Sequence, residues 1–151
     1  MTSKVRPKFI TMSAAYPKGT AEDVFRLIGG RVEANGFANS CSIRVSRALN
    51  YSGYPVKFLP PNLTVSGNDG KWYVYRVKEL VKYLQEQFGD PDIVVVNKPY
   101  KNELKDKKGI IVFEVDAWSD ASGHATLWDG TSCSDKCYFP LARKVMLWEL
   151  K

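Results

Sequence analysis

The chain has 151 residues, of which 44% are hydrophobic and 25% are charged, a balance that is ordinary for a folded globular protein. Lysine and arginine (22) exceed aspartate and glutamate (16), and the formal net charge of +6 predicts an anionic partner: nucleic acid, an acidic membrane surface or an acidic cell-wall polymer. No stretch approaches the roughly 18 apolar residues of a membrane-spanning helix, so membrane insertion is not expected.

The N-terminal residues 1–9 carry basic side chains but no apolar core after them, which is not the pattern of a secretory signal peptide. We therefore expect the protein to be made in the cytoplasm and to leave it only through a dedicated export machine.

Periodic patterns along the chain predict a mixture of helices and strands in one domain. Apolar residues recur at helical spacing in four stretches: residues 9–16, 20–28, 41–50 and 76–88. Short runs of β-branched and aromatic residues predict four strands: residues 93–96, 109–118, 124–128 and 144–150. We expect loops at residues 31–39, at residues 54–75 with a turn at residues 66–70, and at residues 97–108.

Cys41 lies at the predicted start of the helix over residues 41–50. A thiol in this place feels the positive end of the helix dipole, which favours the thiolate. Ser40 precedes it and is a candidate N-cap, because its hydroxyl can accept a hydrogen bond from a first-turn N–H. Cys41 is therefore a candidate nucleophile, although a small buried cysteine fits the same pattern.

The chain contains a single histidine, His124, in a predicted strand far downstream of Cys41. An early cysteine on a helix and a late histidine on a strand follow the order of papain-like enzymes. A buried histidine that only packs within a β-hairpin is the alternative interpretation of His124.

A thiol–imidazole pair needs a third group that orients the imidazole, and two aspartates follow His124. Asp129 lies five residues further along the same strand, so it should point to the opposite face, roughly 16–17 Å away. Asp135 returns after a turn at residues 129–132. Whether two or four residues form that turn, Asp135 lies on the face of His124 and within side-chain reach, so Asp135 is favoured.

Cys133 and Cys137 flank Asp135. In one extended strand they would lie about 13 Å apart, beyond the ~7 Å limit between the Cα atoms of a disulfide, so a bridge needs a bulge or turn at residues 134–136. The residues leave open a disulfide, two unpaired cysteines, or a zinc site completed by His124 and an aspartate. Because that ligand set is thin, we expect no metal and no cofactor.

Four blocks of this sequence resemble the fourth family of type VI secretion amidase effectors. They are residues 27–35 (LIGGRVEAN), 39–53 (NSCSIRVSRALNYSG), 123–130 (GHATLWDG) and 133–137 (CSDKC). The resemblance covers most of the chain, with no departure at the three catalytic-type positions. It implies an α+β, papain-like NlpC-type fold, in which helices pack on a small antiparallel sheet and the catalytic cysteine begins a helix. Residues 1–151 would then form a single amidase domain.

The resemblance also implies an activity. It implies an antibacterial peptidoglycan amidase that type VI secretion machinery delivers into the periplasm of a target bacterium, where it cleaves stem peptides between D-glutamate and meso-diaminopimelate. By the same resemblance Cys41 is the nucleophile, His124 the base and Asp135 its orienting group. A cognate immunity protein that inserts at the active site is implied too, as is a Cys133–Cys137 disulfide that forms in an oxidising periplasm.

This activity assigns roles to further residues. We expect the backbone N–H of Cys41 to donate to the oxyanion, with Asn39 as a candidate second donor. Arg44 is a candidate ligand for substrate carboxylates, and Trp128 a candidate floor of the substrate groove. Solvated surface and core packing are the alternatives for these side chains.

Two other functions fit parts of the sequence. A basic domain rich in aromatic residues could bind single-stranded nucleic acid by base stacking, but known nucleic-acid motifs are not found and the basic residues are scattered, so no nucleic-acid partner is expected. A related Cys–His enzyme, such as a deamidase or transglutaminase, would use the same three residues on another substrate.

Overall fold

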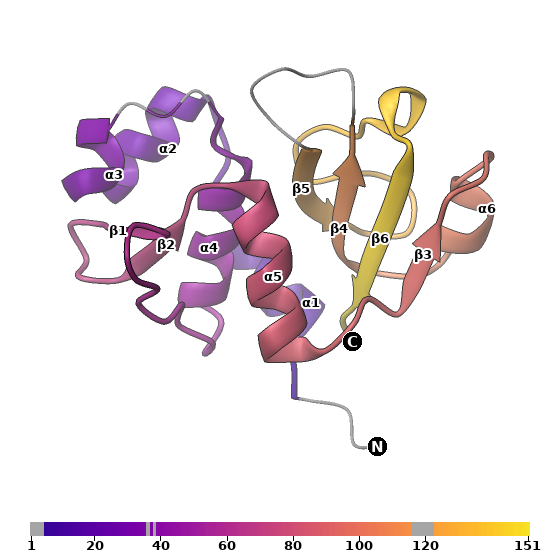
Figure 1. Cartoon of the computed structure of the whole chain (residues 1–151), viewed down its shortest axis with the longest axis horizontal. Helices are drawn as coiled ribbons and strands as arrows, with labels where there is room; N and C mark the ends of the chain where they lie inside the picture. Colours follow the sequence, from indigo (N-terminus) through magenta and orange to yellow (C-terminus); the bar gives the residue numbers. More distant parts are fainter. Residues whose placement is uncertain (1–4, 36, 38, 116–122) are drawn as a thin grey trace.

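A computed structural model describes residues 5–35, 37, 39–115 and 123–151. A helical half and a sheet half lie side by side (Figure 1). The helical half consists of α1 (Phe9–Ala15), α2 (Ala21–Ile28), α3 (Gly30–Asn35), α4 (Cys41–Asn50), the hairpin strands β1 (Thr64–Ser66) and β2 (Trp72–Val74), and α5 (Val77–Phe88). The sheet half consists of β3 (Ile93–Val95), α6 (Lys101–Leu104), β4 (Gly109–Glu114), β5 (Gly123–Trp128), a 3-10 turn (Phe139–Leu141) and β6 (Lys144–Glu149).

The strands of the sheet half form one antiparallel sheet in the order β3-β6-β4-β5. β5 is thus an edge strand, and its register against β4 pairs His124 with Phe113 and Ala125 with Val112. Successive side chains of a strand point to opposite faces, so the sheet contributes to two cores. The face toward α4 and α5 carries Ile110, Val112, Met146 and Trp148. The face toward α6 carries Ile111, Phe113, Val145 and Leu147.

Helix α4 lies inside the molecule, with nine of its ten residues buried. It packs against α1, β2 and β5, so its polar side chains are surrounded as well as its apolar ones. Asn50 shows how they are accommodated: its amide donates to the carbonyl of Trp72 at 2.9 Å and its oxygen accepts from the N–H of Val56 at 2.7 Å. Polar residues of α4 therefore fasten neighbouring segments while remaining hydrogen-bonded themselves.

Arg44, a candidate substrate ligand, is one of these buried residues, with only 7% of its surface exposed. Its guanidinium donates to the Ser40 hydroxyl (2.9 Å) and to the carbonyls of Pro17 (3.1 Å) and Gly19 (2.8 Å). These bonds hold the segment that follows α1 against the first turn of α4. The expectation that Arg44 contacts substrate is therefore corrected: its side chain is buried, and three of its five N–H groups donate within the fold.

The α+β class with helices packed on an antiparallel sheet is confirmed, as are the four predicted helices and the turn at residues 66–70, which joins β1 to β2. Thr20 and Asp23 form a capping box at the start of α2, with bonds of 3.1 and 3.3 Å. The expected loop at residues 31–39 is wrong, because α3 begins at Gly30. Gly29 and Gly30 both have positive φ (68° and 58°), which turns the chain so that a second helix can start and bury Val32.

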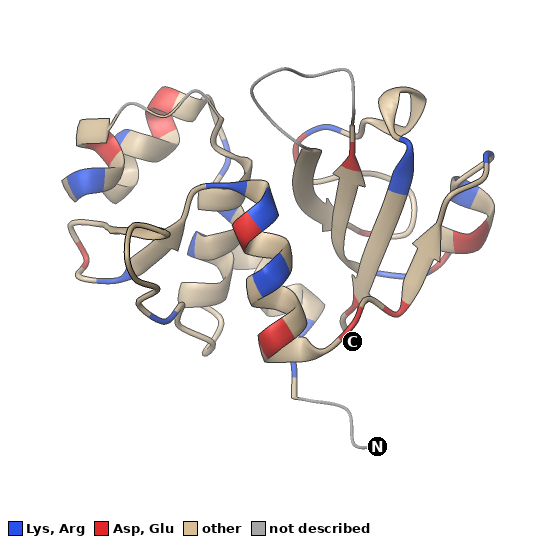
Figure 2. Ribbon diagram, viewed as in Figure 1, with Lys and Arg blue, Asp and Glu red and all other residues tan. Residues whose placement is uncertain are grey.

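The loop expected at residues 97–108 contains the short helix α6, which buries Leu104. Strand β4 ends at Glu114, and residues 116–118 of the predicted strand lie outside the described residues. In the part of the chain that the structure describes, no helix is long and apolar enough to cross a membrane. Lysines and arginines occur in both halves and are interspersed with acidic residues (Figure 2).

We expect Arg44→Met to lower the free energy of unfolding by about 2–4 kcal/mol, since it removes the donors to the buried carbonyl of Pro17 and to the part-buried carbonyl of Gly19. Urea denaturation followed by tryptophan fluorescence measures this change. Arg31→Met on exposed α3 is the matched control and should stay within about 0.5 kcal/mol of the wild type. An Arg44→Met protein of unchanged stability but raised KM would restore the substrate-binding interpretation.

Candidate active site

Cys41 and His124 come together because α4 packs against β5. Cys41 is the first residue of α4 and His124 the second residue of β5, and both side chains are buried. The thiol lies within hydrogen-bonding reach of the imidazole. A cysteine and a histidine that are 83 positions apart in the sequence thus share one site, as the papain-like order predicted.

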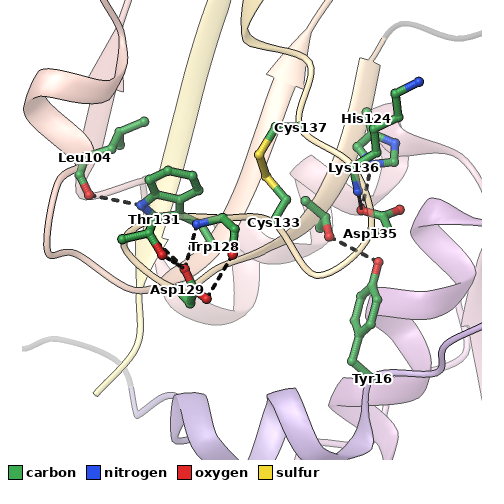
Figure 3. The surroundings of a disulfide bond; sticks show 12 residues. Tyr16, Leu104, His124, Trp128, Asp129, Thr131, Cys133, Asp135, Lys136 and Cys137 are labelled. Atoms are coloured by element: carbon green, nitrogen blue, oxygen red, sulfur yellow. Dashed lines mark hydrogen bonds and ion pairs between the residues drawn. A yellow bond between two sulfur atoms is a disulfide. The ribbon is translucent and has the colours of Figure 1, made fainter.

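Asp135 supplies the third side chain. Its Oδ1 lies 3.1 Å from Nε2 of His124, which leaves Nδ1 as the ring nitrogen available to the thiol (Figure 3). Trp128 and Cys133 form a β-bridge, and the Ser134 N–H donates to the Leu127 carbonyl at 2.9 Å. The turn therefore has four residues, the second of the two registers considered.

Asp129 has a different task. Its carboxylate accepts from the backbone N–H groups of Thr131 (2.8 Å) and Ser132 (2.7 Å), and from their hydroxyls, so it closes the turn at residues 129–132 (Figure 3). These local bonds lower the pKa of Asp129. The preference for Asp135 over Asp129 as the partner of His124 agrees with this geometry.

Cys133 and Cys137 are joined by a disulfide whose Cα atoms lie 5.5 Å apart (Figure 3). The chain bends at Ser134 and Asp135, so the hairpin ladder stops after the single bridge at Cys133. This is the turn that a disulfide at this spacing requires. Because both sulfurs are used in the bridge, neither is a thiolate that could bind zinc. Among the described residues, no group of three or more potential ligands is arranged to hold a metal.

Aromatic rings fix the imidazole in place. The ring of Tyr138 meets His124 edge to face, with centroids 4.7 Å apart, and Phe113 lies 6.5 Å away on the paired strand. Tyr138 was not identified from the sequence, because it follows the disulfide in a segment without regular periodicity. Its neighbour Cys137 was the only local signal that this segment belongs to the site.

Electrostatics favour a charged His124. Burial by itself lowers the pKa of His124, but the hydrogen bond and negative charge of Asp135 and the interaction with Cys41 raise it to about 9. Burial raises the pKa of Asp135, yet hydrogen bonds from His124, Thr126 and the N–H of Lys136 hold it below its usual range. Near neutral pH the pair is therefore an imidazolium bound to a carboxylate.

The start of α4 differs from the expectation. Asn39 Oδ1 accepts the N–H of Cys41 at 2.9 Å, whereas the Ser40 hydroxyl accepts from Arg44 instead of capping the helix. The predicted Ser40 cap is therefore wrong. The Cys41 N–H, expected to face the oxyanion, is engaged by Asn39 in this structure. Of the two candidate oxyanion donors, it is the NH₂ of the Asn39 carboxamide that this bond leaves available.

Trp128, the candidate floor of a substrate groove, is 2% exposed. Its indole N–H donates to the carbonyl of Leu104 at 3.0 Å, and its ring packs edge to face against Phe139. Trp128 therefore belongs to the core between the sheet and α6, which corrects the expected substrate contact.

Because His124 is the only histidine, its imidazole resonances in an NMR spectrum are unambiguous. We expect a titration midpoint near pH 9 in the wild type. In Asp135→Asn the carboxylate is lost while burial remains, so the midpoint should fall by roughly two pH units. A wild-type midpoint near 6.5 would contradict the ion pair.

The same pair makes stability depend on pH. A histidine with a raised folded-state pKa stabilises the fold fully below its unfolded pKa of about 6.5, and this contribution is lost as the pH rises through about 9. Urea denaturation should therefore show a free energy of unfolding that decreases over this window, by on the order of 2–3 kcal/mol. Asp135→Asn should remove most of that decrease.

Comparison with known proteins agrees with this geometry. The sequence model described as type VI secretion system (T6SS), amidase effector protein 4 (Tae4) matches residues 37–148. The structure of the effector Tae4 from Enterobacter cloacae has a TM-score of 0.91 at 38% identity, over 99% of this chain and 100% of its own. No match is found among curated proteins.

Two complexes give the same result. The effector Tae4 from Salmonella typhimurium, solved with the immunity protein Tai4 from Enterobacter cloacae, has a TM-score of 0.90 at 38% identity. The Tae4–Tai4 complex from Enterobacter cloacae has a TM-score of 0.90 at 37% identity. Each match covers 97% of this chain and 100% of the other. The chain therefore belongs to the Tae4 family of type VI secretion amidase effectors, and its function is that of a peptidoglycan amidase toxin.

Proposed function

We propose that this amidase hydrolyses the amide between D-glutamate and meso-diaminopimelate in peptidoglycan stem peptides, with Cys41 as nucleophile, His124 as general base and acid, and Asp135 as the group that orients His124. The observation that carries the assignment is the contact of Asp135 Oδ1 with His124 Nε2 at 3.1 Å, with the thiol of Cys41 at the other side of the imidazole. Nucleophile, base and orienting group are the three roles that thiol catalysis requires.

Acylation begins when His124 holds the thiol proton on Nδ1 and the sulfur of Cys41 attacks the γ-carbonyl carbon of D-glutamate. The carbonyl π electrons move to the oxygen, which becomes the oxyanion. As the C–N bond breaks, His124 delivers its proton to the departing amine of diaminopimelate. Asp135 keeps the imidazolium oriented throughout. The raised pKa of His124 suits a group that must carry a proton to a basic leaving amine.

Deacylation reverses these roles. His124, now neutral, takes a proton from a water molecule while the water oxygen attacks the thioester carbon. The C–S bond breaks, the free γ-carboxyl group of D-glutamate leaves, and Cys41 and His124 return to their starting state. No cofactor enters either half-reaction.

We further propose that residues 1–151 act as one amidase domain, which is supported by the match to the whole of each Tae4 chain. The proposed route is delivery by type VI machinery and action in the periplasm of the target bacterium. Since the matched Tae4 structures include complexes with Tai4, we propose a cognate immunity protein that binds this chain at its active site.

The distribution of charge favours this function over nucleic-acid binding. Basic residues occur in both halves and are interspersed with acidic ones (Figure 2). A deamidase or transglutaminase would need the same triad, and family membership favours the amidase. Product analysis decides between hydrolysis and transfer, because only hydrolysis yields a free γ-carboxyl group.

We expect wild-type protein to convert purified muropeptides into fragments whose stems end at D-glutamate, as measured by mass spectrometry. Cys41→Ala should abolish this product, and Asp135→Asn should lower the rate by roughly 10²–10⁴-fold because the imidazole loses its orienting group. Asp129→Asn is the matched control: it removes a carboxylate from the same hairpin that does not contact His124, and the rate should stay close to wild type.

Unchanged fragments with wild type and Cys41→Ala alike would refute the proposed cleavage. Equal losses in Asp135→Asn and Asp129→Asn would instead show that the hairpin, and not the carboxylate at His124, is what the reaction needs.

The disulfide should matter because it fixes both ends of the bend that carries Asp135. We expect the Cys133→Ser/Cys137→Ser variant to lose on the order of 10- to 100-fold in kcat, since misplacing the orienting group weakens catalysis. Dithiothreitol should reduce the wild-type rate toward that of the variant. The variant, which retains Cys41, should not respond to the reductant; a similar response in both proteins would assign the effect to Cys41.

A further inference from the structure

Two buried hydroxyl groups lie behind Asp135, on the side away from His124. Tyr16 follows the last residue of α1, and its hydroxyl oxygen lies 3.2 Å from Oγ1 of Thr126 on β5. The two residues are only 3% and 0% exposed. Figure 3 shows Tyr16 pointing from the helical half toward the hairpin that carries Asp135. The catalytic mechanism derived above uses neither residue.

The bend of the hairpin brings Asp135 to Thr126. Thr126 lies two residues beyond His124, on the same side of β5. After the bridge between Trp128 and Cys133 the chain bends at Ser134 and Asp135, and hydrogen bonding from the Thr126 hydroxyl lowers the pKa of the Asp135 carboxyl group. Asp135 therefore accepts from Thr126 in addition to His124 and the N–H of Lys136.

The hydrogen bonds that link Tyr16, Thr126 and Asp135 can run in only one direction, from Tyr16 to Asp135. An ionised carboxylate only accepts, so the Thr126 hydroxyl must donate its single proton to Asp135. The oxygen of Thr126 is then left to accept, and the Tyr16 hydroxyl must donate to it. Burial and the nearby charge of Asp135 raise the pKa of Tyr16, so its phenol stays neutral and keeps the proton that it donates.

We propose that Tyr16 and Thr126 are positioning residues for the reaction: their hydroxyls form a chain, Tyr16 to Thr126 to Asp135, that holds the Asp135 carboxylate in the orientation in which it accepts from His124. The inference rests on the proposed roles of Asp135 and His124 in catalysis. It assigns a role to the N-terminal helix, whose end reaches the back of the site.

Other charges face this chain too. His124 on β5 faces Asp135, while Cys41 and Arg44 on α4 face Tyr16. Arg44 and His124 carry positive charge, and Cys41 is the proposed nucleophile. The hydroxyl groups of Tyr16 and Thr126 are neutral and add no charge to the site. Removing either hydroxyl therefore changes hydrogen bonding to Asp135 without changing the net charge of the site.

The test compares Thr126→Val, which removes the hydroxyl at nearly constant volume, with Thr126→Ser, which keeps it. We expect Thr126→Val to lower kcat on purified muropeptides about tenfold, with KM within twofold of wild type. The acid limb of kcat/KM should move to higher pH, because a carboxylate with one donor fewer protonates more easily. Thr126→Ser should restore the wild-type limb. Tyr16→Phe should shift the limb in the same direction by a smaller amount.

Tyr83→Phe is the matched control for the loss of a buried tyrosine hydroxyl, since that hydroxyl accepts from the N–H of Lys57 and lies outside the chain to Asp135. It should leave the pH profile unchanged.

A second readout does not depend on activity. The resonances of His124 also report the protonation of Asp135 at acidic pH, and Thr126→Val should raise that midpoint because the carboxylate loses a donor. A wild-type midpoint and a wild-type acid limb in Thr126→Val would overturn the inference. If wild-type protein cleaves no muropeptide, the proposed function fails, while the shift in midpoint still shows whether the hydroxyl chain supports Asp135.

Discussion

The site depends on the packing of α4 against β5. Cys41 belongs to the helical half and His124 to the sheet half, so neither half contains the proposed catalytic pair by itself. The same two elements contribute to the apolar core that joins the halves, with Val45 on α4 and Ala125 on β5 in one core cluster. Burial of that cluster therefore stabilises the fold and sets the separation of sulfur and imidazole in one step.

Because the site forms where two halves meet, its polar groups are buried and each needs a partner. Burial opposes the charge on His124, and the carboxylate of Asp135 reverses this effect. That carboxylate is partly buried as well, so it needs donors of its own. A buried ion pair in proteins is stable only when such secondary hydrogen bonds are present. The need for hydrogen-bond partners therefore extends from the imidazole to Asp135, and from Asp135 to residues that do not contact the substrate.

The sequence predicts the three proposed catalytic residues better than it predicts the residues that hold them in place. Cys41 at a helix start and Asp135 on the face of His124 follow from periodicity and turn length, which are local properties of the chain. The buried role of Arg44 does not follow, because an arginine in an amphipathic pattern indicates a solvated face. Only the neighbours that surround α4 on every side make its polar residues internal, and those neighbours are set by tertiary structure. The role of Tyr16 does not follow from the sequence for the same reason, since its hydrogen-bond partner Thr126 lies 110 residues away.

Asp135 differs from Cys41 and His124, the other two members of the proposed triad, in the interactions that hold it in place. Cys41 and His124 belong to a helix and a strand, where repeated backbone hydrogen bonds fix each residue. Asp135 lies on a bend beyond a single β-bridge, and its position comes from the disulfide and from hydrogen bonds with neighbouring groups. These are few and local, so they can be broken while the sheet and helices remain intact. Reduction of the Cys133–Cys137 disulfide should therefore change the orientation of the imidazole without unfolding the protein. The stability of the fold and the geometry of the active site then depend on different interactions.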